Sequence, residues 1–180
     1  MNTLYAIQAP QQCELLVAFS DLSAFKHCAQ DQSEEQLFAA MAEYYELVGD
    51  IVGEGGGNIV KFIGDAALLV FPADAVDTGV LALRALKERG DEFFAACSDT
   101  CRHLVKAHFG RVCCGPIGTR DDKRFDVFGH AVNIAALLTS DGLALTPQVF
   151  RRLTPQTRRH FKKHTPPISY ISVEDRHRKN

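Results

Sequence analysis

Two aspartates in different parts of the chain, Asp21 and Asp65, could together bind a metal ion. A magnesium site of this kind uses one or two carboxylates together with substrate phosphates and water. Two adjacent carboxylates repel each other, so they are stable when a positive ion lies between them. Each residue also has a purely structural interpretation, because Asp21 could cap the helix that follows and Asp65 is an ordinary turn residue. The metal-site interpretation therefore depends on whether the fold brings the two carboxylates together.

The predicted secondary structure gives the order in which the chain positions these residues. Ser33 and Gln36 form a capping-box pattern, and the helical spacing of apolar residues after it predicts a helix over 34–52. Two strand-like runs separated by Gly64 and Asp65 predict a tight hairpin. The predicted strands cover 13–20, 58–63, 66–71, 103–118 and 124–129, and further helices cover 74–97 and about 130–140.

This order of strand, helix, hairpin, helix and strand predicts a ferredoxin-like β-α-β-β-α-β sheet of the α+β class, with helices packed on one face. In this topology the third strand lies beside the first and antiparallel to it. Asp21 follows the first strand and Asp65 lies in the hairpin before the third, so the two carboxylates meet at one sheet edge. Apolar runs at 143–146 and 168–173, with a helix near 147–153 between them, predict additional C-terminal strands.

The composition favours one cytoplasmic domain with neither a nucleic acid nor a membrane as partner. The 180 residues are 46% hydrophobic and 23% charged, and their net charge of -2 gives no electrostatic reason to bind nucleic acid. No apolar run approaches the ~20 residues that a membrane span needs, and no segment resembles a secretory signal. The six cysteines match no zinc signature, which favours reduced thiols in the cytoplasm. We expect a loose leader over 1–12, one domain over 13–175 and a basic tail over 176–180.

Four sequence blocks connect this fold to a family. FSDLSAF (19–25), GGGNIVKFIGDAALLVF (55–71), HFGRVCCGPIG (108–118) and RFDVFGHAVNIAALL (124–138) resemble, in order and spacing, the motifs of class III adenylyl/guanylyl (nucleotide) cyclase catalytic domains. The resemblance spans roughly residues 13–173. It implies a phosphorus–oxygen lyase, in which the ribose 3'-hydroxyl of a nucleoside triphosphate attacks the α-phosphate and pyrophosphate leaves.

The resemblance also implies cofactors and a phosphate-binding segment. Two divalent cations, Mg²⁺ or Mn²⁺, suit this displacement, and Asp21 and Asp65 match the aspartates that bind them. Backbone N–H groups of a loop at a helix start would bind the phosphates. This loop consists of Leu22, Ser23, Ala24 and Phe25.

Three further residues match the positions that recognise the nucleoside. Lys61 and Asp126 match the pair that reads the base, in a form that resembles the adenine-selecting one, and Asn133 matches the residue that orients the ribose. Structural interpretations stay open, because Lys61 could simply face solvent and Asn133 could satisfy a backbone carbonyl. Asp126 could pair with Arg124 or Lys123.

The C-terminal segment FKKHTPPISYISV resembles the part of the family that carries a phosphate-binding lysine, although the usual glycine after it is absent. Lys162 and Lys163 are both candidates. In active members one subunit gives the aspartates and the other gives the base-reading pair and the asparagine. The resemblance therefore implies a homodimer with sites at its interface.

The chain departs from the family at Leu137. Four residues after the asparagine, on the same helical face, the family has an arginine that contacts the α-phosphate in the transition state. Leucine offers neither its charge nor its hydrogen bonds, and we interpret Leu137 as a packing residue. Losing one such donor typically lowers the rate ~10²–10³-fold.

Two interpretations follow from this departure. The first, which we favour, is a nucleotide cyclase that prefers ATP and is slow, or that is rescued by another cation such as Arg111, Arg120 or a C-terminal lysine. The second is a degenerate module that binds nucleotide, or forms a heterodimer with a complete cyclase chain. A pyrimidine triphosphate as substrate is disfavoured by the adenine-like pair.

Overall fold

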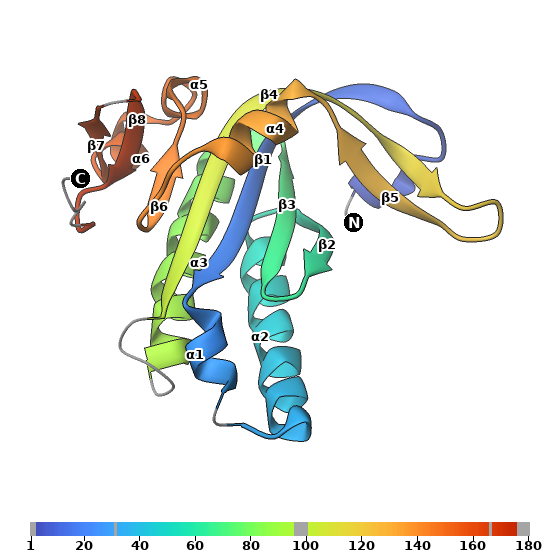
Figure 1. The fold of residues 1–180 in the computed structure, drawn as a ribbon. Coiled ribbons are helices and arrows are strands. Elements are labelled where there is room, and N and C mark those ends of the chain that lie inside the picture. The colour runs from blue at the N-terminus through green and yellow to red at the C-terminus, as the bar shows by residue number, and fades with distance from the viewer. Residues whose placement is uncertain (1–2, 31, 96–100, 166, 176–180) are drawn as a thin grey trace.

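The protein folds around one sheet of eight strands with helices on both faces (Figure 1). A computed structural model describes residues 3–30, 32–95, 101–165 and 167–175. The strands are β1 (Gln11–Ser23), β2 (Asn58–Ile63), β3 (Ala66–Pro72), β4 (Arg102–Gly118), β5 (Lys123–Phe128), β6 (Leu143–Leu145), β7 (Phe161–His164) and β8 (Ser169–Ser172). The helices are α1 (Phe25–Ala29), α2 (Glu34–Glu54), α3 (Val76–Ala95), α4 (His130–Leu137), α5 (Pro147–Phe150) and α6 (Pro155–Arg158), with 3₁₀ helices η1 (Thr3–Ala6) and η2 (Ala73–Ala75). None of the helices in the described ranges is both long enough and apolar enough to cross a membrane.

The predicted ferredoxin-like core is confirmed, but the expectation that helices pack on one face is wrong, because α4 covers the face opposite α2 and α3. Along the sheet the strands follow the order β2-β3-β1-β4-β6-β8-β7, and β5 pairs with β4 outside this path. Strand β1 is antiparallel to both β3 and β4, and β2 and β3 form the predicted hairpin. Helices α2 and α3 lie together on one side of this sheet, while α4 crosses the other (Figure 1).

Two hydrophobic cores lie on opposite faces of the central strand β1. Leu16 and Ala18 point into the first core, beneath α2 and α3, whereas Leu15 and Val17 point into the second, beneath α4 and β5. Successive side chains of a strand point to opposite faces, so a strand covered on both sides must be apolar at every position. This explains why β1 reads as a continuous apolar run instead of an alternating one.

Local sequence signals set the ends of α2. The Ser33 hydroxyl accepts a hydrogen bond from the Gln36 backbone N–H at 3.3 Å, and the Gln36 side chain accepts one from the Ser33 N–H at 3.0 Å, so the predicted capping box is confirmed. The glycines after Glu54 end the helix. A Cβ at Gly57 would collide with the ring of Phe71, so glycine lets the chain pack closely against β3.

The structure differs from the predicted elements in several places. Strand β1 covers 11–23 instead of 13–20, because its polar end still pairs with β4 as far as Ser23. The leader is not loose throughout, since Leu4 is buried in the second core. The elements α1, α6 and β7 were not predicted, and α5 is shorter than expected. The predicted helix over 74–97 is present over Val76–Ala95, and residues 96–97 and the basic tail 176–180 lie outside the described residues.

Candidate active site

The fold brings Asp21 and Asp65 to the same edge of the sheet. Strands β1 and β3 pair as far as Ser20 and Ala67, so Asp21 lies one residue beyond this pair and Asp65 lies in the hairpin just before β3. Asp21 lies inside β1, not after it, but the expected meeting of the carboxylates does not change. Burial raises the pKa of Asp65, and the negative charge of Asp21 raises this pKa further, while the backbone N–H groups of Asp65 and Leu22 lower it.

The chemistry of this pair fits a hard divalent cation. Both ligands are carboxylates, and their mutual repulsion, which contributes to the raised pKa of Asp65, is relieved when a cation lies between them. In the part of the chain that the structure describes, no group of three or more His, Cys, Asp and Glu side chains is placed to bind a metal ion. A cation held here needs oxygen ligands beyond the two carboxylates, and the phosphates of a nucleotide, water or a backbone carbonyl can provide them.

The segment 22–25 is only partly the loop that the sequence predicts. Leu22 and Ser23 belong to β1, and the Leu22 N–H donates to Oδ1 of Asp21 at 3.0 Å. Ala24 has a left-handed backbone with φ of 57° and turns the chain into α1, which begins at Phe25. The Leu22 amide therefore stabilises the carboxylate pair, and phosphate binding by this segment stays a prediction.

Lys61 and Asp126 form an ion pair within one chain. Nζ of Lys61, on β2, lies 2.5 Å from Oδ2 of Asp126, on β5. Oδ1 of Asp126 accepts the Val127 N–H at 2.8 Å. Arg124 instead pairs with Asp122, at 3.1 Å. Lys61 is therefore held in place rather than extended freely into solvent, and the pair presents one donor and one acceptor side by side.

Helix α4 exposes the face that carries Asn133. Ala131 and Ala135 are its buried residues, and their small side chains let the helix lie close to the sheet. The Asn133 side-chain amide makes no hydrogen bond to any residue that the structure describes, so it does not satisfy a backbone carbonyl there. Leu137, four residues on, is 84% exposed. The interpretation of Leu137 as a packing residue is wrong, because the described residues leave most of its side chain exposed.

Comparison with known proteins agrees with this arrangement. The sequence profile of the adenylate and guanylate cyclase catalytic domain matches residues 7–165. The chain belongs to this family. Adenylate cyclase 1 of Rhizobium meliloti is 25% identical over 134 residues, which cover 69% of this chain and 20% of that protein.

Solved structures of the family share the fold. The adenylyl cyclase CyaB from P. aeruginosa aligns with a TM-score of 0.79 at 17% identity, over 93% of this chain and 97% of that one. A dimeric guanylyl cyclase domain from the aquatic fungus Blastocladiella emersonii aligns with a TM-score of 0.77 at 18% identity, over 91% and 96% of the two chains. The chain spans 20 to 31% of the length of three curated adenylate cyclases that it matches.

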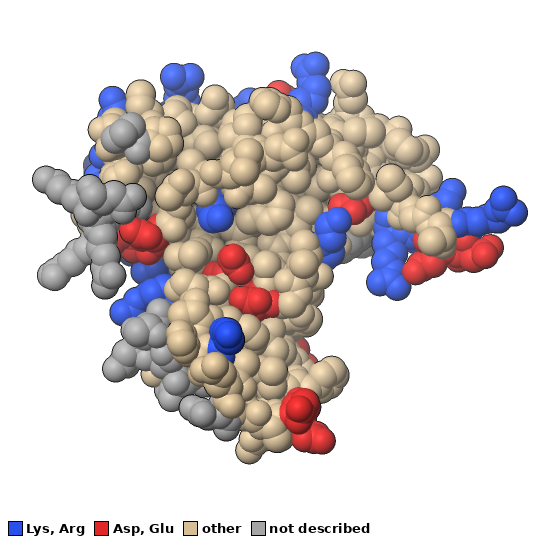
Figure 2. All heavy atoms as spheres, viewed as in Figure 1, with Lys and Arg blue, Asp and Glu red and all other residues tan. Residues whose placement is uncertain are grey.

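Arg111, one of the cations considered as a replacement for the missing arginine, cannot reach α4 in the same cyclase domain. Along β4, Phe109 points into the first core and Val112 into the second. Arg111 therefore projects on the side of Phe109, opposite α4. Arg120 follows β4 in the turn to β5, and charges of both signs gather at the tip of this β4–β5 hairpin (Figure 2). Neither side chain makes a hydrogen bond or an ion pair with α4 within the described residues.

The two C-terminal lysines differ in their surroundings. Nζ of Lys162 donates to the backbone carbonyls of Val173 at 2.8 Å and Asp175 at 2.9 Å, so this lysine fastens the C-terminal segment. Lys163 is its neighbour on β7 and projects to the opposite side. Its side chain is exposed and makes no hydrogen bond or ion pair to a described residue. Of the two phosphate-binding candidates, Lys163 is the one whose ammonium is available.

A buried polar pair beneath the carboxylates was missed by sequence reasoning. The Tyr44 hydroxyl lies 2.9 Å from Nε2 of His103, whose Nδ1 lies 2.9 Å from the carbonyl of Leu86. A carbonyl only accepts, so Nδ1 carries the proton and Tyr44 donates to Nε2. Burial lowers the pKa of His103, and burial together with the charges of Asp65 and Asp21 raises that of Tyr44. The one sequence feature that pointed to this pair is Gly90, a glycine inside α3, where a Cβ would collide with the His103 ring.

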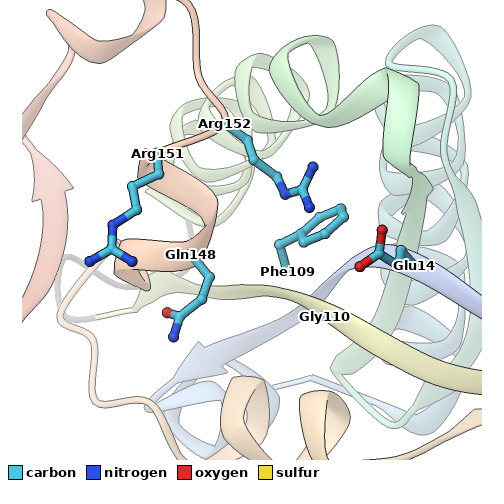
Figure 3. A pocket seen from close by; sticks show the side chains of 6 residues that line it. All are labelled: Glu14, Phe109, Gly110, Gln148, Arg151 and Arg152. Carbon is cyan, nitrogen blue, oxygen red and sulfur yellow. The ribbon is translucent and has the colours of Figure 1, made fainter.

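A hollow of about 330 Å³ lies elsewhere on the domain (Figure 3). Its lining consists of Glu14, Phe109, Gly110, Gln148, Arg151 and Arg152. The guanidinium of Arg152 lies over the Phe109 ring, 3.6 Å from its centroid (Figure 3). Neither Asp21 nor Asp65 lines this hollow, so it is separate from the candidate metal site.

Proposed function

We propose that this domain is a metal-dependent nucleotide cyclase that converts a nucleoside triphosphate, with ATP favoured, into a 3',5'-cyclic nucleotide and pyrophosphate. The observation that carries the proposal is the meeting of Asp21 and Asp65 at the sheet edge, in a family whose catalytic domains form cyclic nucleotides. The other elements of the site support it, since Lys61 and Asp126 are already paired and Asn133 is exposed. The rate is low, because Leu137 occupies the transition-state arginine position.

Asp21 and Asp65 would hold the two divalent cations, Mg²⁺ or Mn²⁺. Bound cations would activate the attacking hydroxyl and neutralise the leaving phosphates. The chain's own residues do the positioning: Lys61 donates to the base and Asp126 accepts from it, while the Asn133 amide orients the ribose. ATP is favoured because adenine presents an acceptor ring nitrogen next to a donor amino group, and because the relative from Rhizobium meliloti is an adenylate cyclase.

We propose that the site forms between two copies of this chain, in the cytoplasm where nucleoside triphosphates are abundant. Two large apolar side chains, on β4 and α4, are exposed: Ile117 at 52% and Leu137 at 84%. A second copy would cover such surfaces. A guanylyl cyclase domain from Blastocladiella emersonii with the same fold, 18% identical to this chain, forms a non-canonical dimer.

A second candidate function is favoured by one observation. The exposed face of α4 carries Leu137 where the family has its arginine, and Arg111 projects from the opposite side of the sheet. A homodimer would carry this defect in both sites. The alternative is a degenerate module that binds nucleotide, or completes a site in a heterodimer with a complete cyclase chain.

The experiment is a substrate screen on the purified protein. ATP, GTP, CTP and UTP are each incubated with Mn²⁺, and pyrophosphate and cyclic product are measured together with nucleotide binding. The proposal predicts slow formation of cyclic AMP with an equal amount of pyrophosphate. Metal-dependent binding without product from any of the four triphosphates would leave the degenerate module as the function.

A further inference from the structure

An exposed aromatic ring stands beside the Lys61–Asp126 pair. Phe128 is the last residue of β5 and is 54% exposed, although fully burying a Phe side chain is worth about 1.5–3 kcal/mol. Val127 before it is buried in the second core. Because side chains alternate along a strand, Phe128 and Asp126 project to the side opposite Val127. The acid and the ring therefore share one outer surface.

The lysine joins this surface from another strand. Nζ of Lys61 lies over the Phe128 ring, 6.0 Å from its centroid, and 2.5 Å from Oδ2 of Asp126. An ammonium at this distance is attracted to the ring face, and this attraction adds to the ion pair in fixing the position of Lys61. The three side chains thus form one cluster, in which a donor and an acceptor stand at the edge of an uncovered aromatic face.

We propose that Phe128 is the stacking face for the nucleotide base, and that it sets base affinity together with Lys61 and Asp126. This inference rests on the proposed function. A planar base that reaches the two charged groups with its edge lies over the ring, where its π-face is removed from water. Base–aromatic stacking of this kind tolerates every base, so Phe128 strengthens binding of the base while the charged pair selects which base binds.

The position of Phe128 in the chain fits this role. Gly129 follows it with φ of 152°, and α4 with Asn133 begins one residue later. The ring therefore lies in sequence between the residue that would accept from the base and the residue that would orient the ribose. A nucleoside that binds Asp126 with its base and Asn133 with its ribose therefore has its base beside Phe128.

The test compares ATP with a probe that has no base. Binding of ATP and of inorganic tripolyphosphate, each with Mn²⁺, is measured by calorimetry for the wild type, Phe128→Ala and Phe128→Trp. Phe38→Ala is the matched control, because Phe38 is 78% exposed on α2, away from the pair. We expect Phe128→Ala to weaken ATP binding about tenfold and to leave tripolyphosphate binding unchanged. Phe128→Trp keeps a stacking face and retains ATP affinity, and Phe38→Ala has no effect.

Three results would overturn the inference. ATP affinity that does not fall in Phe128→Ala excludes a base contact, and an equal loss for both probes indicates a structural role. Sedimentation of Phe128→Ala is measured at the same concentrations. If the variant regains ATP affinity only at concentrations where it forms a dimer, Phe128 acts as an interface residue and not as a base contact. Product formation is recorded separately: a wild type that binds ATP through Phe128 but forms no cyclic AMP contradicts the proposed function and leaves this inference standing.

Discussion

Replacing Leu137 with arginine should raise the rate of cyclic AMP formation about 100-fold or more. The side chain at this position is 84% exposed, so the substitution removes little buried apolar surface and should change the free energy of unfolding by no more than about 0.5 kcal/mol. A single preorganised donor to transition-state charge is typically worth ~10²–10³ in rate, or about 2.7–4 kcal/mol. The expected fall in activation free energy is therefore much larger than the expected change in the free energy of unfolding.

The assay follows cyclic AMP and pyrophosphate at saturating ATP and Mn²⁺, with thermal unfolding of each variant. Ala136→Arg is the matched control, because Ala136 is also exposed, but one residue turns the helix by about 100° and points the new side chain elsewhere. Leu137→Lys adds charge without a planar fork and should give a smaller gain. An unchanged rate in Leu137→Arg, with ATP binding intact, would refute the reasoning that one missing arginine limits this site.

The other predictions concern the carboxylates, the base-reading pair and the buried histidine. Asp65→Asn should stabilise the metal-free fold at neutral pH. The raised pKa of Asp65 means that the folded state binds its proton more tightly than the unfolded state, so the stability of the wild type falls as pH rises through that pKa. Thermal unfolding of the variant, measured across this pH range, should not show this fall. Lys61→Met should lower kcat/KM for ATP at least about tenfold while changing the free energy of unfolding by less than about 1 kcal/mol, because the ion pair is partly exposed; an equal loss for every triphosphate would contradict base reading. Tyr44→Phe should lower the free energy of unfolding in urea by about 1–3 kcal/mol, since it leaves Nε2 of His103 buried without a donor, and an unchanged midpoint would show that the bond contributes nothing.

The meeting of the carboxylates was predictable because it depends on topology. The Gly64–Asp65 turn, the Ser33 capping box and the apolar run of β1 are local signals, and together they leave few arrangements of the sheet. Once β3 lies beside β1, Asp21 and Asp65 must approach each other. No measurement of side-chain position was needed for that step.

Other features depend on tertiary partners that the sequence does not display. Strand β1 continues through the polar residues Ser20 and Asp21 because β4 pairs with them, not because their own propensity favours a strand. Short polar β7 has no apolar pattern and pairs with β8 at the edge of the sheet. Helix α4 is apolar almost throughout, so periodicity cannot tell that only Ala131 and Ala135 are buried and that Leu137 projects outward.

The most direct test of the account measures cyclic AMP formation against Mn²⁺ concentration for the wild type and Asp21→Asn. The account predicts slow, metal-dependent product from the wild type. It predicts no product from Asp21→Asn, which removes one of the two carboxylates but keeps the size of the side chain. Equal product from both proteins, or none from the wild type while it binds ATP and Mn²⁺, would contradict the claim that Asp21 and Asp65 support cyclisation.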